Sequence, residues 1–154
     1  MEFKKLANNT INFTLNRIIE ILGIVILLTG IFLLTALLSF SPDDPNFIFP
    51  NNTEIKNLLG FQGSFTADLF FQSIGLISYL VSFTLILTGI NIFRSKDFFL
   101  IIENVFFIVL YCIFGSLFFS FFYNETFTLY INGNGGFVGS YLNKGVLGNF
   151  IKLN

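Results

Sequence analysis

Three long apolar segments constrain this chain more than any other feature of its sequence. Residues 21–40 and 69–93 contain no charged side chain, and residues 98–122 contain only one, Glu103. A helix of about 20 residues rises about 30 Å, which matches the hydrocarbon core of a bilayer. Each segment is therefore predicted to be a membrane-spanning helix, and the second and third are long enough to span with some tilt.

The composition supports the membrane class and removes several kinds of chemistry. Only 11% of the residues are charged, whereas a soluble domain carries about 25%. The absence of histidine excludes imidazole zinc sites and His acid–base pairs, and the single cysteine, Cys112, cannot form an internal disulfide. The dispersed Lys and Arg residues form no basic patch for nucleic acid. Without a nucleophile–base pair or a metal cluster, we expect no enzyme activity, cofactor or metal in this chain.

A signal peptide is the alternative interpretation of the first segment, because Lys4, Lys5 and Arg17 precede it. The apolar part of a signal peptide is only about 7–15 residues long. The greater length of this segment favours an uncleaved span.

The positions of the cations predict the orientation of the spans. Residues 94–97 form so short a link that the second and third helices are expected to be antiparallel neighbours. The loop at 41–68 contains only one cation, Lys56. Positive residues favour the cytoplasmic side, so the N-terminus and the link are predicted inside and the loop outside. The cations that carry this prediction are Lys4, Lys5, Arg17, Arg94 and Lys96.

The predicted fold is an all-α integral membrane protein. It is a three-span helical bundle with an extracytoplasmic loop and a short extracytoplasmic C-terminal segment. Three divisions are expected: a cytoplasmic arm at 1–20, a transmembrane domain at 21–122 and an extracytoplasmic Gly-rich segment at 123–154. Within the transmembrane domain, the spans are expected at about 21–40, 69–93 and 98–122, and the outer loop at 41–68.

The sequence SPDDPN, at residues 41–46, explains why the first span ends abruptly. Aspartate at the centre of a membrane helix costs about 2.5–3.5 kcal/mol, so Asp43 and Asp44 are expected outside the lipid. Pro42 and Pro45 disfavour helix at the residues that precede them. The stretch is predicted to be an exit turn on the side away from the cytoplasm.

The parts outside the spans give weaker patterns. The loop is compatible with a short surface helix at 54–59. After the third span, residues 127–131 (FTLYI) predict a short strand, and residues 132–136 (NGNGG) predict a tight turn, because Asn and Gly tolerate positive φ. Residues 137–153 form an amphipathic stretch compatible with a helix at the outer face.

Small residues align on one side of the second span and predict close helix packing. Gly23 and Gly30 on the first span are the expected counterpart within the chain. Packing inside this bundle is the favoured interpretation, and a contact between subunits is the alternative. The small residues of this possible packing face are Gly75, Ser78, Ser82 and Gly89.

The loop acids have a functional and a structural interpretation. Asp43, Asp44 and Glu54 could offer oxygen ligands to a divalent cation, but they lack EF-hand spacing, and solvated loop acids are favoured. Asp68, at the outer end of the second span, is predicted to cap that helix at the membrane interface.

Glu103 is an acid one to two turns inside the third span, near its cytoplasmic end. Intramembrane acids can serve in proton relays. At this depth the side chain can also reach the interface or a cationic neighbour such as Arg94 or Lys96, and we favour that structural role.

Three stretches in order resemble a known family. They are SFSPDDPNF after the first span, NLLGFQGSFTADLFFQSIGLISYL leading into the second, and GNGGFVGSYL beyond the third. Over roughly residues 15–150 the chain resembles the N-terminal membrane region of FtsK/SpoIIIE-type bacterial DNA translocases. The positions that carry the motifs are Ser41, Asp44, Pro45, Asn57, Gly60, Gly63, Asp68, Gly135, Gly136 and Gly139.

The resemblance implies a location in the bacterial inner (cytoplasmic) membrane and a role in cell division and chromosome partition. In this family the region anchors the protein at the division septum and assembles with other division proteins, while a separate hexameric ATPase motor moves double-stranded DNA. The family has four spans and this chain is predicted to have three, which would leave its C-terminus outside. We therefore expect a fragment or truncated product without a motor, since a fourth span would have to follow residue 154.

The favoured function is thus a membrane anchor and septum-targeting domain that acts through protein contacts. Its expected partners are membrane lipid, membrane proteins of the division site and further copies in a homo-oligomer, with no direct contact to nucleic acid. The alternative is a small inner-membrane transporter or channel subunit in which Glu103 lines a polar path.

Overall fold

A computed structural model describes residues 2–45, 54–123 and 132–145 of the chain. The described part is helical and has no strand. Three helices are long and apolar enough to cross a membrane, within Asn9–Leu38, Ile77–Ser95 and Phe99–Phe122. The predicted all-α, three-span fold is confirmed. The helices are α1 (Glu2–Leu38), α2 (Gly60–Ile74), α3 (Ile77–Ser95), α4 (Phe99–Phe122) and α5 (Gly136–Lys144).

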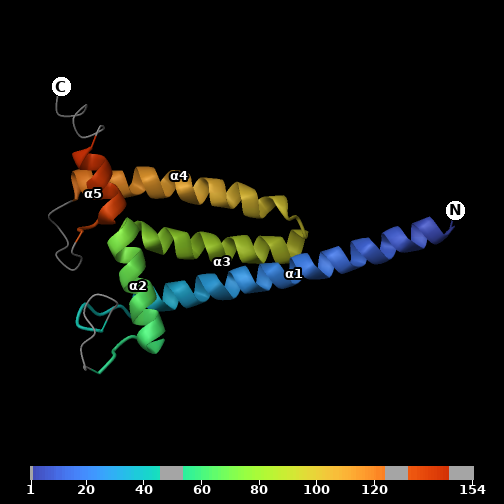
Figure 1. Ribbon diagram of the computed structural model, residues 1–154, viewed down its shortest axis with the longest axis horizontal. Coiled ribbons are helices and arrows are strands. Elements are labelled where there is room, and N and C mark those ends of the chain that lie inside the picture. Colours follow the sequence, from blue (N-terminus) through green and yellow to red (C-terminus); the bar gives the residue numbers. More distant parts are fainter. Residues whose placement is uncertain (1, 46–53, 124–131, 146–154) are drawn as a thin grey trace.

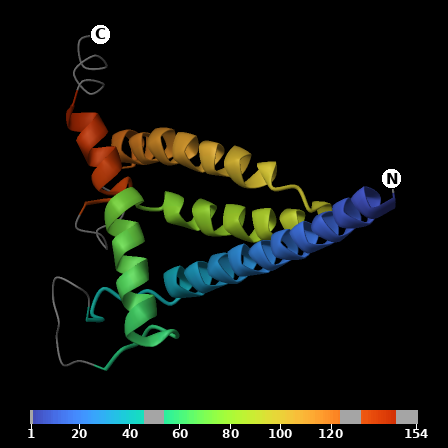
Figure 2. The same cartoon turned by 45° about the vertical axis from the view of Figure 1, so that its right-hand side comes forward.

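The three long helices lie side by side, with α3 between α1 and α4 (Figure 1). The two short helices, α2 and α5, cross the bundle at the end opposite the α3–α4 link (Figure 2). We call this the capped end, and the end that holds the link the link end. The first helix extends past the link end, beyond α3 and α4.

Glycines bring α1 and α3 into close contact. A Cβ atom on Gly89 would lie 2.5 Å from the backbone nitrogen of Leu27, and one on Gly23 would lie 2.8 Å from the backbone nitrogen of Phe93. Gly30 meets Ile86 in the same way, at 2.8 Å. Such close backbone approach is how small residues pack helices in a membrane, where water does not drive association.

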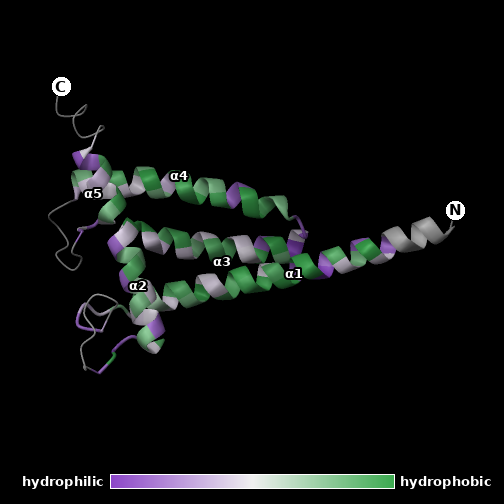
Figure 3. Cartoon of the chain, viewed as in Figure 1, coloured by the Kyte–Doolittle hydropathy of each residue, from purple (hydrophilic) through white to green (hydrophobic). Residues whose placement is uncertain are grey.

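The outer surface of the bundle is apolar, as a lipid environment requires. Hydrophobic residues cover most of α1, α3 and α4 (Figure 3). The exposed apolar residues of α4 alone include Phe99, Ile102, Val105, Phe106, Phe107, Val109, Leu110, Ile113, Phe114 and Phe118.

The prediction of a single span at 69–93 is wrong for its first part. The helix α2 ends at Ile74, the chain turns at Gly75 with φ 65°, and α3 begins at Ile77. Only glycine adopts this conformation readily. The turn is held from outside, because the backbone N–H of Leu76 donates to the carbonyl of Asn134 over 2.9 Å.

The segments outside the long helices differ in part from the prediction. Residues 54–59 form no helix, and α2 starts only at Gly60. The predicted turn at 132–136 is confirmed, because the N–H of Gly136 donates to the carbonyl of Gly133 over 3.1 Å. The helix α5 begins one residue before the amphipathic stretch predicted at 137–153 and covers its first part, whereas the strand predicted at 127–131 falls outside the described residues.

Candidate functional site: two interlocks at the capped end

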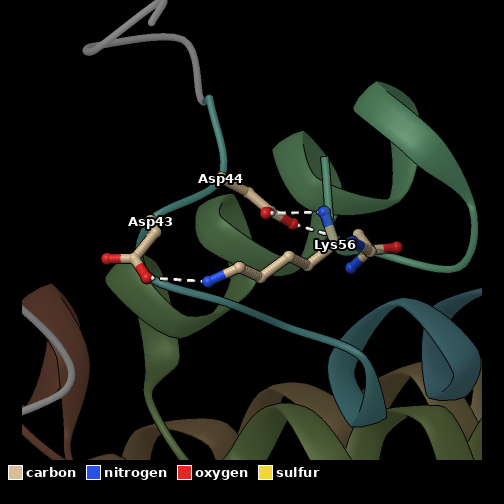
Figure 4. A network of polar contacts seen from close by, with 4 residues as sticks. Asp43, Asp44 and Lys56 are labelled. Atoms are coloured by element: carbon tan, nitrogen blue, oxygen red, sulfur yellow. Dashed lines mark hydrogen bonds and ion pairs between the residues drawn. The ribbon is translucent and has the colours of Figure 1, made fainter. Parts of the chain in front are cut away.

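The first loop is closed by the carboxylate of Asp44 (Figure 4). Its two oxygens accept hydrogen bonds from the backbone N–H groups of Lys56 and Asn57, each over 2.8 Å. Asp44 is only 4% exposed to solvent. The adjacent Asp43 is exposed and pairs with the Lys56 ammonium at 3.0 Å. The interpretation of Asp44 as a solvated acid is therefore wrong. The carbonyl of Ser41 accepts a hydrogen bond from the Asp44 N–H, and this turn directs the carboxylate into the loop.

Asn57 joins this loop to the end of α1. Its side-chain amide donates to the carbonyl of Ala36 over 2.9 Å, and its side-chain oxygen accepts the N–H of Leu59 over 3.1 Å. The side chain is buried, and a Cβ atom on Gly63 would lie 2.1 Å from its oxygen. A side chain at position 63 would thus displace Asn57.

These contacts explain the spacing N-x-x-G-x-x-G. Asn57 supplies the polar side chain, Gly60 makes the turn into α2 at φ 64°, and Gly63 leaves space for the Asn57 oxygen. The Ser64 hydroxyl then donates to the carbonyl of Pro45 over 3.0 Å. We call the cluster of Ser41, Asp44, Pro45, Asn57, Gly60, Gly63 and Ser64 the first interlock.

Asp68 has a different place from the one predicted. It lies in the middle of α2, not at a helix N-terminus, because the helix already starts at Gly60. It is 8% exposed, and the Gln72 amide donates to it over 3.4 Å. Burial raises the pKa of the Asp68 carboxyl, and the Gln72 hydrogen bond opposes this rise.

Gln72 connects α2 to the second loop. The side-chain amide of Asn132 donates both to the backbone carbonyl and to the side-chain oxygen of Gln72, each over 3.2 Å. Asn134, also buried, donates to the carbonyl of Tyr123 over 2.6 Å. From the sequence, these asparagines were predicted only as turn residues. Their alternation with glycine in NGNGG was the available signal.

The second interlock consists of the motif glycines packed on α4 and on the α2–α3 turn. Cβ atoms on Gly135 and Gly139 would lie 2.3 and 2.2 Å from the carbonyl oxygen of Ser116. Gly136, at φ 62°, fits against Gly75, where a Cβ atom would lie 2.6 Å from the backbone nitrogen. All three glycines are therefore required by packing.

Serine hydroxyls and an asparagine complete this second interlock. The Ser116 hydroxyl donates to the carbonyl of Ile74 over 3.0 Å, which ties α4 to the end of α2. The side-chain amide of Asn143 donates to the carbonyl of Ser120 over 3.2 Å, which ties α5 to α4. The two interlocks thus fix α2 and α5 across the end of the bundle.

The small-residue face of α3 is occupied by the chain itself. Gly75 meets Asn134, and Gly89 meets α1. Ser78 and Ser82 are fully buried, and their hydroxyls donate to backbone carbonyls within α3 and its preceding turn.

The link end carries two ion pairs that share one residue and were not predicted from the sequence. Glu20 accepts from Arg17 and pairs with the Lys96 ammonium, the latter at 2.9 Å. The spacing of Arg17 and Glu20 was the available signal. Glu103 is exposed on α4, and within the described residues it forms no ion pair with Arg94 or Lys96.

The capped end combines buried motif residues with exposed apolar side chains. Among the described residues, no group of three or more His, Cys, Asp or Glu side chains could hold a metal ion. The motif side chains are turned into the interlocks, and apolar side chains lie on the outside. The exposed apolar residues at this end include Leu58, Phe61, Leu69, Phe137 and Tyr141.

Comparison with known proteins finds one matching family. A family model described as the 4TM region of DNA translocase FtsK/SpoIIIE matches residues 16–152. This match contains both interlocks. No solved structure matches the chain.

Three curated relatives carry the name DNA translocase FtsK. The protein of Vibrio vulnificus is 38% identical over 78 residues, which cover 50% of this chain and 8% of the relative. The protein of Rickettsia bellii is 30% identical over 76 residues, covering 49% and 10%. The protein of Rickettsia prowazekii is 24% identical over 87 residues, covering 54% and 12%. The chain therefore matches about a tenth of each relative's length.

Proposed function

The chain belongs to the family of the 4TM region of DNA translocase FtsK/SpoIIIE, and we propose that it anchors such a translocase in the cytoplasmic membrane at the division septum. Three apolar helices and the family match make it a multi-pass membrane protein. The observation that carries the proposal is that the family match extends over both interlocks. The anchor acts through contacts, and DNA translocation belongs to a motor outside the matched region.

The proposed orientation places the link end in the cytoplasm and the capped end outside. Arg17, Arg94 and Lys96 lie at the link end, where positive residues favour the cytoplasmic side. Only Lys56 and Lys144 are cations among the described residues of the capped end. With this orientation, the N-terminus lies in the cytoplasm.

The proposed partners follow from the exposed surfaces. Lipid covers the apolar sides of α1 and α4. The capped end presents the exposed apolar residues Leu58, Phe137 and Tyr141, which suit contacts with membrane proteins of the division site. The long helices are available for contacts with further copies of the chain.

Imaging in dividing bacterial cells tests the proposed function. A fluorescent protein is fused to the N-terminus, and its distribution is compared with that of a membrane dye. A band at midcell, stronger than the dye signal there, is the expected result. A signal that follows the dye uniformly around the cell would contradict septum targeting by this chain.

A further inference from the structure

One outward face of α4 is apolar except for a single acid. Glu103 is exposed, and Phe99, Phe106 and Leu110, which lie one or two helical turns away on the same face, are exposed as well. The face that packs on α3 is a different one. There, the Tyr111 hydroxyl donates to the Thr84 hydroxyl over 2.9 Å.

One outward face of α3 carries a single cation among mostly apolar residues, with Asn91 as a further polar residue. Leu80, Leu87 and Arg94 follow one another at seven-residue spacing, and all three are exposed. Phe83 and Ile90 lie on the same face and are exposed too. Neither this face nor the face with Glu103 is covered by another described element.

The two charges lie at similar depth. Arg94 is the residue before the last one of α3, and Glu103 is the fifth residue of α4. At the helical rise, Glu103 is about 6 Å inside the start of α4. The long side chain of an arginine reaches across such a difference.

Neither charge is compensated within the described part of the chain. Arg17, Glu20 and Lys96 pair with each other at the link end, and Asp97 in the link accepts the backbone N–H of Phe99 over 2.9 Å. Glu103 and Arg94 form no ion pair among the described residues. Because charges inside a membrane are costly unless they are paired or reach water, such residues commonly mark contacts.

We propose that Glu103 of one copy pairs with Arg94 of a second copy, so that the α4 face of one chain packs on the α3 face of the next. Each copy presents one acid on one face and one cation on another, so the contact is head-to-tail and every copy can use both faces. The charges are complementary, and most other residues of both faces are apolar. This inference rests on the self-association in the proposed function and names its contact.

Charge reversal tests the contact in two steps. The full chain is labelled with donor or acceptor dyes and placed in phosphatidylcholine vesicles, and energy transfer between copies is measured as the chain is diluted with lipid. Glu103→Arg alone and Arg94→Glu alone should each weaken self-association at least about tenfold, because like charges then face each other.

An equal mixture of the two variants should restore energy transfer between donor-labelled E103R and acceptor-labelled R94E chains. In the mixture every head-to-tail contact joins opposite charges again. A pair within one chain would instead be restored only by the double variant and not by mixing. The mixture also controls for folding, since a misfolded variant could not be rescued by a partner.

Lys144→Glu serves as the matched charge-reversal control, because Lys144 is exposed at the capped end, away from both faces. It should leave self-association unchanged. Unchanged energy transfer in both single variants, or no recovery on mixing, would overturn the proposal. Failure here leaves midcell localisation untouched, and loss of midcell localisation would not alter energy transfer in vesicles.

Discussion

At the scale of single residues, two adjacent aspartates have opposite surroundings. Asp43 is exposed and makes an ion pair with a lysine side chain, whereas Asp44 is buried and holds two backbone N–H groups. Exposed ion pairs contribute little to stability, while hydrogen bonds to a buried charge contribute much more. The sequence shows two identical carboxylates, and only the turn that precedes them distinguishes their roles.

Replacing each of these aspartates by alanine should have very different effects. Asp44→Ala leaves the N–H groups of Lys56 and Asn57 without their acceptors and should lower the free energy of unfolding by about 2–4 kcal/mol. Asp43→Ala, the matched control, should lower it by less than about 1 kcal/mol. Unfolding of the detergent-solubilised chain measures both. Equal losses in the two variants would contradict the structure of the first interlock.

Asp68 should make the stability of the chain depend on pH. Its pKa is raised in the folded state above the ordinary value of 3.8. The folded state therefore binds the proton more tightly than the unfolded state, so the stabilisation from Asp68 is present at low pH and is lost as pH rises through the raised pKa.

The variant Asp68→Asn should be more stable than the original chain at neutral pH. Asparagine keeps an oxygen that accepts from Gln72 and removes the buried charge. The difference between the two chains should shrink as the pH falls toward 4, because the aspartate is then protonated. Unfolding of both chains in detergent between pH 4 and pH 8 measures this. A constant difference over that range would show that Asp68 does not titrate as described.

At the scale of elements, the three spans could be predicted because their signal is local. A run of about 20 apolar residues has few stable alternatives to a membrane helix. The break at Gly75 could not be predicted in this way, since its cause is distant in sequence. Asn134 and Gly136, from the second loop, contact the turn and fix its conformation. For the same reason the motif glycines were recognised from resemblance, but their contacts were not predicted.

Two glycine variants compare a turn without packing contacts with a turn that the second loop contacts. Gly60 and Gly75 have nearly the same φ, 64° and 65°. A Cβ atom at Gly60 would meet nothing within 4 Å, whereas one at Gly75 would lie 1.9 Å from the Asn134 oxygen. Gly60→Ala should therefore cost only the strain of a left-handed residue, about 1–2 kcal/mol.

Gly75→Ala should cost clearly more than Gly60→Ala and should also release α5. The added methyl group cannot fit while the second loop contacts the turn. Hydrogen exchange should then be faster in α5 and in the N–H of Leu76, which donates to Asn134. Equal costs for both variants, with unchanged exchange in α5, would mean that the second interlock does not hold the turn.

At the scale of the whole molecule, the two ends of the bundle differ in their charged residues and in their helices. Most of the cations lie at the link end. The capped end holds the crossing helices α2 and α5 and the motif residues. The proposed anchor requires the capped end to face outward and the link end to face the cytoplasm. Orientation of the bundle is therefore the claim on which the account depends most.

Thiol labelling in intact bacterial cells tests this orientation directly. In a Cys112→Ser background, one chain carries Leu58→Cys at the capped end and another carries Ser95→Cys at the link end, both at exposed positions. A membrane-impermeant maleimide should label the L58C chain in intact cells and the S95C chain only after the membrane is permeabilised. Labelling of the S95C chain, but not of the L58C chain, in intact cells would contradict the proposed orientation and the anchoring role built on it.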